Sequence, residues 1–176
     1  MKKLLLLLLL LLMIPALSFA QFGVSAGFSS AKAKVSGSGI SVDSDNSTSI
    51  GFGLLYDAEI SENLDLLPSI SFAIGEKVGD ESNNAIGFAL NLQYYISGKD
   101  AGFFVSPGVG VGISLADIDT DSFRKSSLSG GVGIGYDFTE SLTLAVAYST
   151  QLSNSSKIDG VKVRGSGFGA ELQFKF

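Results

Sequence analysis

The segment Ile86-Gly-Phe-Ala-Leu-Asn-Leu-Gln-Tyr-Tyr-Ile96 alternates between two kinds of residue along its length. Large apolar or aromatic residues occupy the even positions, and mostly Gly, Ala and amide residues occupy the odd ones. Successive side chains of a β-strand point to opposite faces of the sheet, so an alternation with period two predicts a strand. A helix would place its apolar residues three or four positions apart, and this segment does not. The segment therefore predicts a strand with one bulky face and one small face.

The same alternation recurs on both sides of this segment and predicts eight strands between residues 22 and 176. Tight polar turns are expected at 61–63, 97–101 and 139–141, and longer links, rich in Ser, Asp, Asn and Gly, at 31–48, 75–84, 115–126 and 153–162. Short links at one end and long links at the other are typical of an up-and-down antiparallel barrel. Pro68 and Pro107 fall inside predicted strands, where each requires a bulge or a locally unpaired acceptor. The predicted fold class is all-β: an eight-stranded antiparallel barrel over residues 21–176.

The composition of the two faces indicates which one points outward. The small face consists mainly of Gly, Ser, Ala and amides, and only 16% of the whole chain is charged. Such a face would make a poor water-exposed surface, but it suits the narrow interior of an eight-stranded barrel. The bulky face is then expected to contact lipid, with aromatic residues near both strand ends forming two interfacial girdles. A soluble barrel, with the bulky residues inside, is the alternative.

The first twenty residues have the layout of a secretory signal peptide. Lys2 and Lys3 precede an apolar run from Leu4 to Ile14, and small residues at Ser18 and Ala20 follow. A membrane anchor is the alternative, but the run is far shorter than the roughly 20 residues that a spanning helix needs. We expect cleavage after Ala20, which leaves a mature chain, 21–176, with ten basic and 17 acidic residues and a net charge of −7. That charge argues against nucleic acid as a partner.

The chain closes with Phe168-Gly-Ala-Glu-Leu-Gln-Phe-Lys-Phe176, in which apolar residues alternate up to a final phenylalanine. This resembles the carboxy-terminal signal by which the barrel assembly machinery recognises outer-membrane β-barrels, and Phe168, Leu172, Phe174 and Phe176 match it. The stretch Gly135-Tyr-Asp-Phe-Thr-Glu-Ser-Leu-Thr-Leu144 is also similar to small barrels of the OmpA/OmpX-like superfamily. The resemblance implies a monomeric transmembrane barrel in the bacterial outer membrane, with periplasmic termini and four external loops. It also implies that periplasmic chaperones and the assembly machinery act during biogenesis.

The composition leaves little room for chemistry. The chain has no histidine and no cysteine, so it lacks Ser–His or Cys–His nucleophiles and thiolate or imidazole metal ligands. Barrel enzymes of the outer membrane resemble this fold but rely on histidine, so no enzymatic activity and no cofactor is expected. Asp117, Asp119 and Asp121 are spaced like the start of a calcium loop, but that loop needs Gly and Glu where Ser122 and Leu128 stand. A solvated loop is the preferred interpretation.

Two groups of charges are expected to gather by strand parity. One is an inward-facing group near the short turns, for which either a cation-attracting mouth or, preferably, a hydrated rim with partial pairing is expected: Asp57, Glu59, Asp65, Asp137 and Glu171, with Lys175 nearby. The other lies on the outward face just beyond the long-loop girdle, where the first and eighth strands are neighbours: Lys32, Lys34, Lys162 and Arg164.

The second group suggests a site for lipopolysaccharide phosphates, because Arg offers a fork of donors and Lys a charge on a flexible stem. Ordinary solvated charge at strand ends is the simpler interpretation.

Two classes of function remain open. The protein is either a structural or interaction barrel that presents loops and contacts outer-membrane lipid, or a small pore or transporter for ions or small hydrophobic solutes.

Overall fold

A computed structural model describes residues 20–78, 81–99, 102–116 and 121–176. Within these ranges the chain forms β-strands in the following order: β1 (Ala20–Gly37), β2 (Ile40–Asp43), β3 (Ser47–Ser61), β4 (Leu64–Val78), β5 (Glu81–Tyr95), β6 (Phe103–Ser114), β7 (Ser126–Thr139), β8 (Leu142–Gln151) and β9 (Val161–Lys175). No helix in the described part of the chain is long and apolar enough to cross a membrane.

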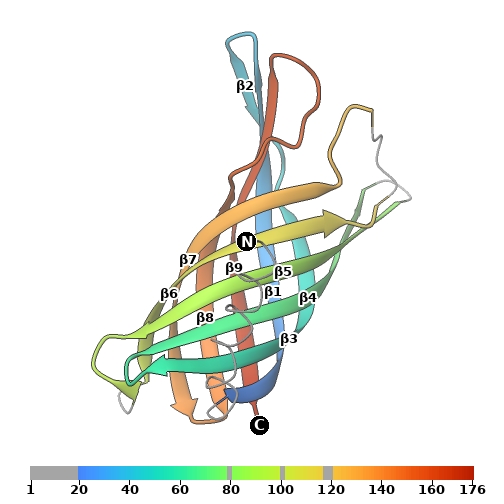
Figure 1. Ribbon diagram of the computed structural model, residues 1–176. Helices are drawn as coiled ribbons and strands as arrows, with labels where there is room; N and C mark the ends of the chain where they lie inside the picture. The colour runs from blue at the N-terminus through green and yellow to red at the C-terminus, as the bar shows by residue number, and fades with distance from the viewer. Residues whose placement is uncertain (1–19, 79–80, 100–101, 117–120) are drawn as a thin grey trace, which may run out of the picture.

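The strands form a closed barrel (Figure 1). β1 pairs with β3, and from β3 onward each strand pairs with the next in antiparallel sense as far as β9. The barrel closes because β9 also pairs with β1. The closing seam runs from Gly23 opposite Lys175 to Gly37 opposite Val161. Among the described strands, β2 pairs only with the far end of β1, and it does not form part of the barrel wall. The predicted eight-stranded antiparallel barrel is therefore confirmed, and its wall consists of β1 and β3 to β9.

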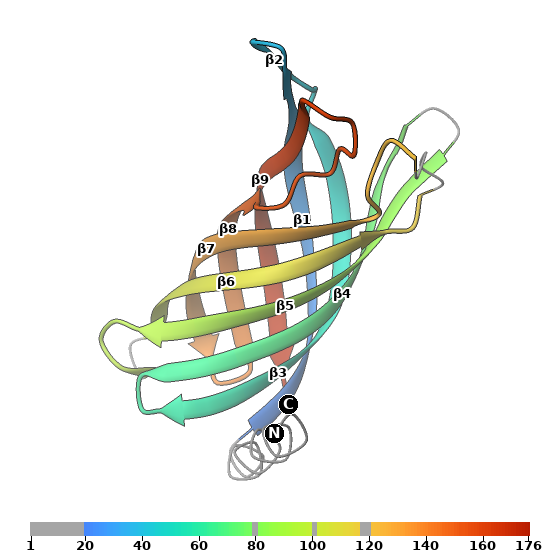
Figure 2. The same cartoon turned by 45° about the horizontal axis from the view of Figure 1, so that its top comes forward.

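Two of the predicted long links are largely strand. β1 continues to Gly37 and turns into β2 through Ser38 and Gly39, whose φ angles of 50° and 81° suit a two-residue hairpin turn. β4 likewise runs to Val78, and β5 begins at Glu81. The β1–β2 hairpin and the segment that leads into β9 lie side by side at the same end of the barrel (Figure 1 and Figure 2). The expectation of loops over 31–48 and 75–84 is therefore wrong over most of their length.

The two faces of the wall are as the alternation predicts. Outward side chains remain strongly exposed in the isolated chain, such as Phe22 at 62% and Phe168 at 63%, as expected for a surface that contacts lipid rather than protein. Aromatic rings pair at the short-turn end, where Phe22 lies 5.1 Å from Tyr56 between ring centroids. At the long-loop end Tyr148 and Phe168 lie 4.9 Å apart. Both girdles are thus present on the outer surface.

Both prolines lie where pairing on one side of the strand is interrupted. Pro68 pairs with Leu90 of β5, and Pro107 pairs with Val132 of β7. On the other side the ladders skip the proline, since pairing passes from Leu55–Ser69 to Ala58–Leu66 and from Asn91–Gly108 to Tyr94–Val105. Each proline therefore lies where its strand is not paired on one side, so its missing N–H breaks no ladder hydrogen bond. This confirms the expectation of a locally unpaired acceptor.

Candidate functional site

Four basic side chains meet on the outer surface at the seam between β1 and β9. We call Lys32, Lys34, Lys162 and Arg164 the basic face. Lys34 stands directly opposite Arg164, Lys32 pairs with Ser166, and Lys162 pairs with Ser36. Lys32 and Lys162 therefore lie diagonally on either side of the Lys34–Arg164 pair. All four residues are exposed. The juxtaposition expected from strand parity is therefore present.

The basic face lies beyond the aromatic girdle of the long-loop end. Lys32 and Arg164 are each four residues from the girdle rings Phe28 and Phe168, which corresponds to roughly 13 Å along a strand. One acid lies within the face, because Asp43 of β2 stands opposite Lys34 and its carboxylate is 3.5 Å from the ammonium of Lys32. The formal charge of the face with Asp43 is +3.

The lumen contains a layer of large side chains, which we call the lumenal plug: Leu55, Leu67, Tyr95 and Phe104. These residues are between 1% and 4% exposed, and the rings of Tyr95 and Phe104 meet edge to face at 5.6 Å. Two of them pack on a glycine opposite. A Cβ at Gly135 would lie 2.6 Å from Cε2 of Phe104, and one at Gly23 would lie 2.8 Å from Cδ1 of Leu55. Glycine in the facing strand therefore makes room for each of these side chains.

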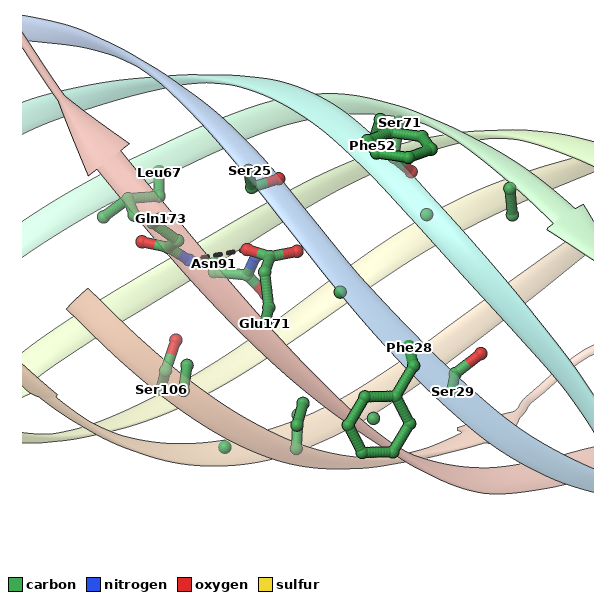
Figure 3. A pocket seen from close by; sticks show the side chains of 18 of the residues that line it. Ser25, Phe28, Ser29, Phe52, Leu67, Ser71, Asn91, Ser106, Glu171 and Gln173 are labelled. Atoms are coloured by element: carbon green, nitrogen blue, oxygen red, sulfur yellow. Dashed lines mark hydrogen bonds between the residues drawn. The ribbon is translucent and has the colours of Figure 1, made fainter. Parts of the chain in front are cut away.

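The plug separates two spaces that share no lining residue. On the long-loop side is a lumenal cavity of about 270 Å³, with Leu67 and Phe104 among its walls. Figure 3 shows this cavity with Leu67 at one side. On the short-turn side is a mouth of about 470 Å³, lined by Tyr95 and by charged residues. In sequence Leu55 stands out as an exception to its strand's parity. Leu67 and Phe104 are also large residues at inward positions, where most residues are small. Large residues on the otherwise small face are the sequence signal for the plug.

The charges of the short-turn mouth are extensively paired. Asp57 accepts from the ammonium of Lys175 at 2.5 Å, and Lys99 bridges Asp65 at 2.7 Å and Glu59 at 3.0 Å. Asp137 accepts from the hydroxyl of Tyr95 at 2.8 Å and from that of Thr143 at 2.6 Å. This arrangement agrees with a paired rim and not with a free cation-attracting mouth.

Lys99 is a member of this cluster that strand parity does not reveal, because it lies in the turn between β5 and β6. Partial burial lowers the pKa of its ammonium, but hydrogen bonds to Asp65 and Glu59 outweigh that effect and raise it overall. Strand parity predicts Glu171 in the same cluster. It lines the lumenal cavity on the other side of the plug, so that assignment is wrong.

The residues of the expected assembly signal share one face of the last strand. Phe168, Leu172, Phe174 and Phe176 all point outward and are between 49% and 72% exposed. The backbone N–H of Phe176 donates to the carbonyl of Phe22 at 2.8 Å, which extends the closing seam to the final residue. These residues therefore form a continuous apolar edge beside β1.

The calcium-loop alternative at Asp117, Asp119 and Asp121 is not tested by the structure, because Asp117 and Asp119 lie outside the described residues. Among the residues that the structure does describe, no group of three or more His, Cys, Asp or Glu could hold a metal ion.

Comparisons with known proteins found one family model and several similar solved structures. A family model described as outer membrane protein beta-barrel domain matches residues 4–176. The solved structure of Neisserial surface protein A is 22% identical, over 89% of this chain and 99% of that chain, with a TM-score of 0.55. Ail, the attachment invasion locus protein of Yersinia pestis, is 21% identical over 88% and 99%, with a TM-score of 0.47. OprG from Pseudomonas aeruginosa is 15% identical over 89% and 96%, also at 0.47. A search of curated proteins found no significant match.

Proposed function

Because this chain belongs to the outer membrane β-barrel family and lies in the bacterial outer membrane, we propose that it is a structural barrel that holds lipopolysaccharide through its basic face. Barrels of this kind carry short periplasmic turns and long external loops. The basic face then belongs to the outer leaflet, beyond the external girdle, where lipopolysaccharide carries its phosphates. The observation that carries the proposal is the register that sets Lys34 opposite Arg164.

The chemistry of the basic face suits a phosphate. Arg164 offers a planar fork of N–H donors that matches two phosphate oxygens, and three lysines add charge on flexible stems. A Lys or Arg near an anionic membrane surface contributes about 1 kcal/mol. A net charge of +3, after the ion pair between Lys32 and Asp43, therefore supports about 3 kcal/mol of attraction, or roughly a hundredfold in affinity.

The lumenal plug supports a structural function over a pore. The layer between the two cavities consists of side chains at most 4% exposed, which supports a lumen that is filled at this depth. An eight-stranded barrel has an interior that side chains fill. We therefore propose that the barrel presents its loops and the basic face and does not form an open ion channel.

The test replaces Lys32, Lys34, Lys162 and Arg164 together with glutamine. Lipopolysaccharide that co-purifies with the barrel is quantified, and thermal unfolding is followed with and without added lipopolysaccharide. We expect both the bound amount and the thermal protection to fall. Asp43→Asn, which removes the one acid inside the face, is expected to shift both in the opposite direction.

The matched control replaces Lys77, Arg124, Lys125 and Lys157 with glutamine, which removes the same number of cations from other exposed positions. We expect this variant to retain most of the bound lipopolysaccharide. If the basic-face variant stays unchanged while the control has the larger effect, the basic face is ordinary solvated charge and the proposal is wrong.

A further inference from the structure

Beyond the long-loop girdle, β1 and β9 continue as a small sheet to which β2 adds a third strand. We call the part of this sheet formed by residues 32–37, 40–43 and 161–166 the emergent sheet. Val35 lies seven residues past the girdle ring Phe28, which corresponds to roughly 23 Å along β1. Figure 1 and Figure 2 show β2 at the end of the barrel opposite to the carboxy terminus. The long loops of such barrels are external, so the emergent sheet projects into the water outside the cell.

The two faces of the emergent sheet differ in chemistry. One of them is the basic face. The other, which we call the apolar face, follows from the register, because residues directly opposite each other in a sheet share a face: Val35, Ile40, Val42, Val161 and Val163. Val35, Ile40 and Val42 are 42%, 69% and 61% exposed. Contiguous apolar side chains that lie in water mark a surface for interaction with another molecule.

β2 also leaves one edge of the emergent sheet without a partner strand in the described part of the chain. Gly37 and Ile40 flank the two-residue turn, and the direction of the backbone N–H and C=O groups alternates along a strand. The backbone groups of Ile40 and Val42 therefore point toward β1. Those of Ser41 and Asp43 point toward the opposite edge, where they are free to pair with an added strand.

This edge lacks the features that normally prevent pairing with another chain. Natural edge strands carry Lys, Pro or a bulge for that purpose. β2 has the sequence Ile40-Ser-Val-Asp43 and a regular register with β1, and its one charge forms an ion pair with Lys32 at 3.5 Å. An unprotected edge beside an exposed apolar face suits an extended segment, whose backbone extends the sheet and whose alternate side chains cover the face.

Symmetry and charge indicate which kind of segment fits. A second copy in the same membrane would be related by a twofold axis along the membrane normal, which pairs the two β2 strands in parallel and sets the apolar face of one copy beside the basic face of the other. Neither face would then be continued. A segment that alternates acidic and apolar side chains continues both faces, because the basic face with Asp43 carries a formal charge of +3 and attracts the acids.

We propose that β2 is a docking edge for an extended segment of another protein outside the cell, in which acidic and apolar side chains alternate. Its backbone pairs with Ser41 and Asp43, its apolar side chains lie beside Ile40 and Val42, and its acidic side chains lie on the side of the basic face. This goes beyond the binding of lipopolysaccharide and holds whether or not the basic face binds that lipid.

The test uses isotope-labelled barrel in phospholipid nanodiscs without lipopolysaccharide and follows backbone amide signals during titration with the end-capped peptide EVEVEV. The peptide KVKVKV reverses the charge, and EEEVVV keeps the composition of the first peptide but removes the alternation. We expect saturable shifts at Ser41 and Asp43 with EVEVEV, and at least tenfold weaker binding of the other two. This comparison needs no substitution in the barrel. Equal affinity for EVEVEV and either of the other peptides would overturn the proposal.

Ser41→Pro tests the edge itself, because it removes an N–H that points away from β1 and leaves the hydrogen bonds of the hairpin in place. It is expected to weaken EVEVEV binding at least tenfold, whereas Ser41→Ala, which keeps the N–H, serves as the matched control and should bind like the wild type. The shift between heated and unheated gel bands confirms that both variants are folded. Unchanged binding by Ser41→Pro would refute docking at this edge. A dimer of the purified barrel that Ser41→Pro abolishes, without peptide binding, would assign the edge to a second copy and also overturn the proposal.

Discussion

Replacing Phe104 with alanine removes the most deeply buried large side chain of the lumenal plug. The phenyl ring is 1% exposed, packs edge to face against Tyr95 and occupies the space above Gly135. We predict that this variant is destabilised. Gly135 of β7 is the residue paired with Phe104. We predict that adding Gly135→Phe to the alanine variant places a phenyl ring in the vacated space and restores part of the stability.

The size of the effect follows from the buried surface of the ring. Truncation of a buried Phe to Ala costs about 3–5 kcal/mol, and the edge-to-face contact with Tyr95 is included in that loss. Water from the adjoining cavity can enter the vacated space, so we expect the lower end, about 3 kcal/mol. Gly135→Phe alone forces two rings into one space and should cost more than 1 kcal/mol, as overpacking does. The double variant should recover at least half of the loss.

The assay is reversible unfolding in urea from lipid vesicles, followed by the shift between folded and unfolded bands on unheated gels. The four proteins form a double-mutant cycle, from which the coupling energy between the two positions is obtained. A favourable coupling of about 2 kcal/mol or more is expected. Additive losses, with no coupling between positions 104 and 135, would refute the role of Phe104 as a plug seated on glycine.

The other predictions concern the mouth and the ends of the chain. Lys175→Met leaves the buried Asp57 without its cation and should cost about 3–5 kcal/mol in urea unfolding, whereas adding Asp57→Asn should return most of it; an unchanged stability of the single variant would show that the pair is not buried in solution. Deleting Phe176 should lower the yield of folded, heat-modifiable barrel in the outer membrane, and full assembly would count against the proposed signal. Intact-mass analysis of membrane-extracted protein should give a chain that begins at Gln21, and a retained leader would reject the predicted cleavage.

The barrel could be predicted because one physical pattern dominates its sequence. Period-two alternation fixes both the strand and its outward face, as in the segment from Ile86 to Ile96, and the lengths of the links fix the topology. The continuation of β1 past Ala31 and the short β2 could not be predicted in the same way. Ile40 and Val42 do alternate with Ser41 and Asp43, but this pattern spans only four residues, and the surrounding Ser, Asp, Asn and Gly residues favour a loop instead.

The interior of the barrel was harder to predict, because it depends on residues brought together from opposite strands. Lys99 lies in a turn, where parity has no meaning, yet it reaches two acids of the mouth. Glu171 shares the parity of those acids, but its depth along β9 places it in the other cavity. The basic face was predicted because its four residues lie on adjacent strands, for which parity and a closed barrel are sufficient.

The central claim is a closed outer-membrane barrel whose lumen is divided by a plug, and single-channel recording of the purified wild-type protein in a planar bilayer tests it most directly. The separation of the lumenal cavity from the short-turn mouth by Leu55, Leu67, Tyr95 and Phe104 predicts a silent baseline or only weak, irregular events. Large, reproducible open-channel steps would contradict the account and identify the protein as a pore.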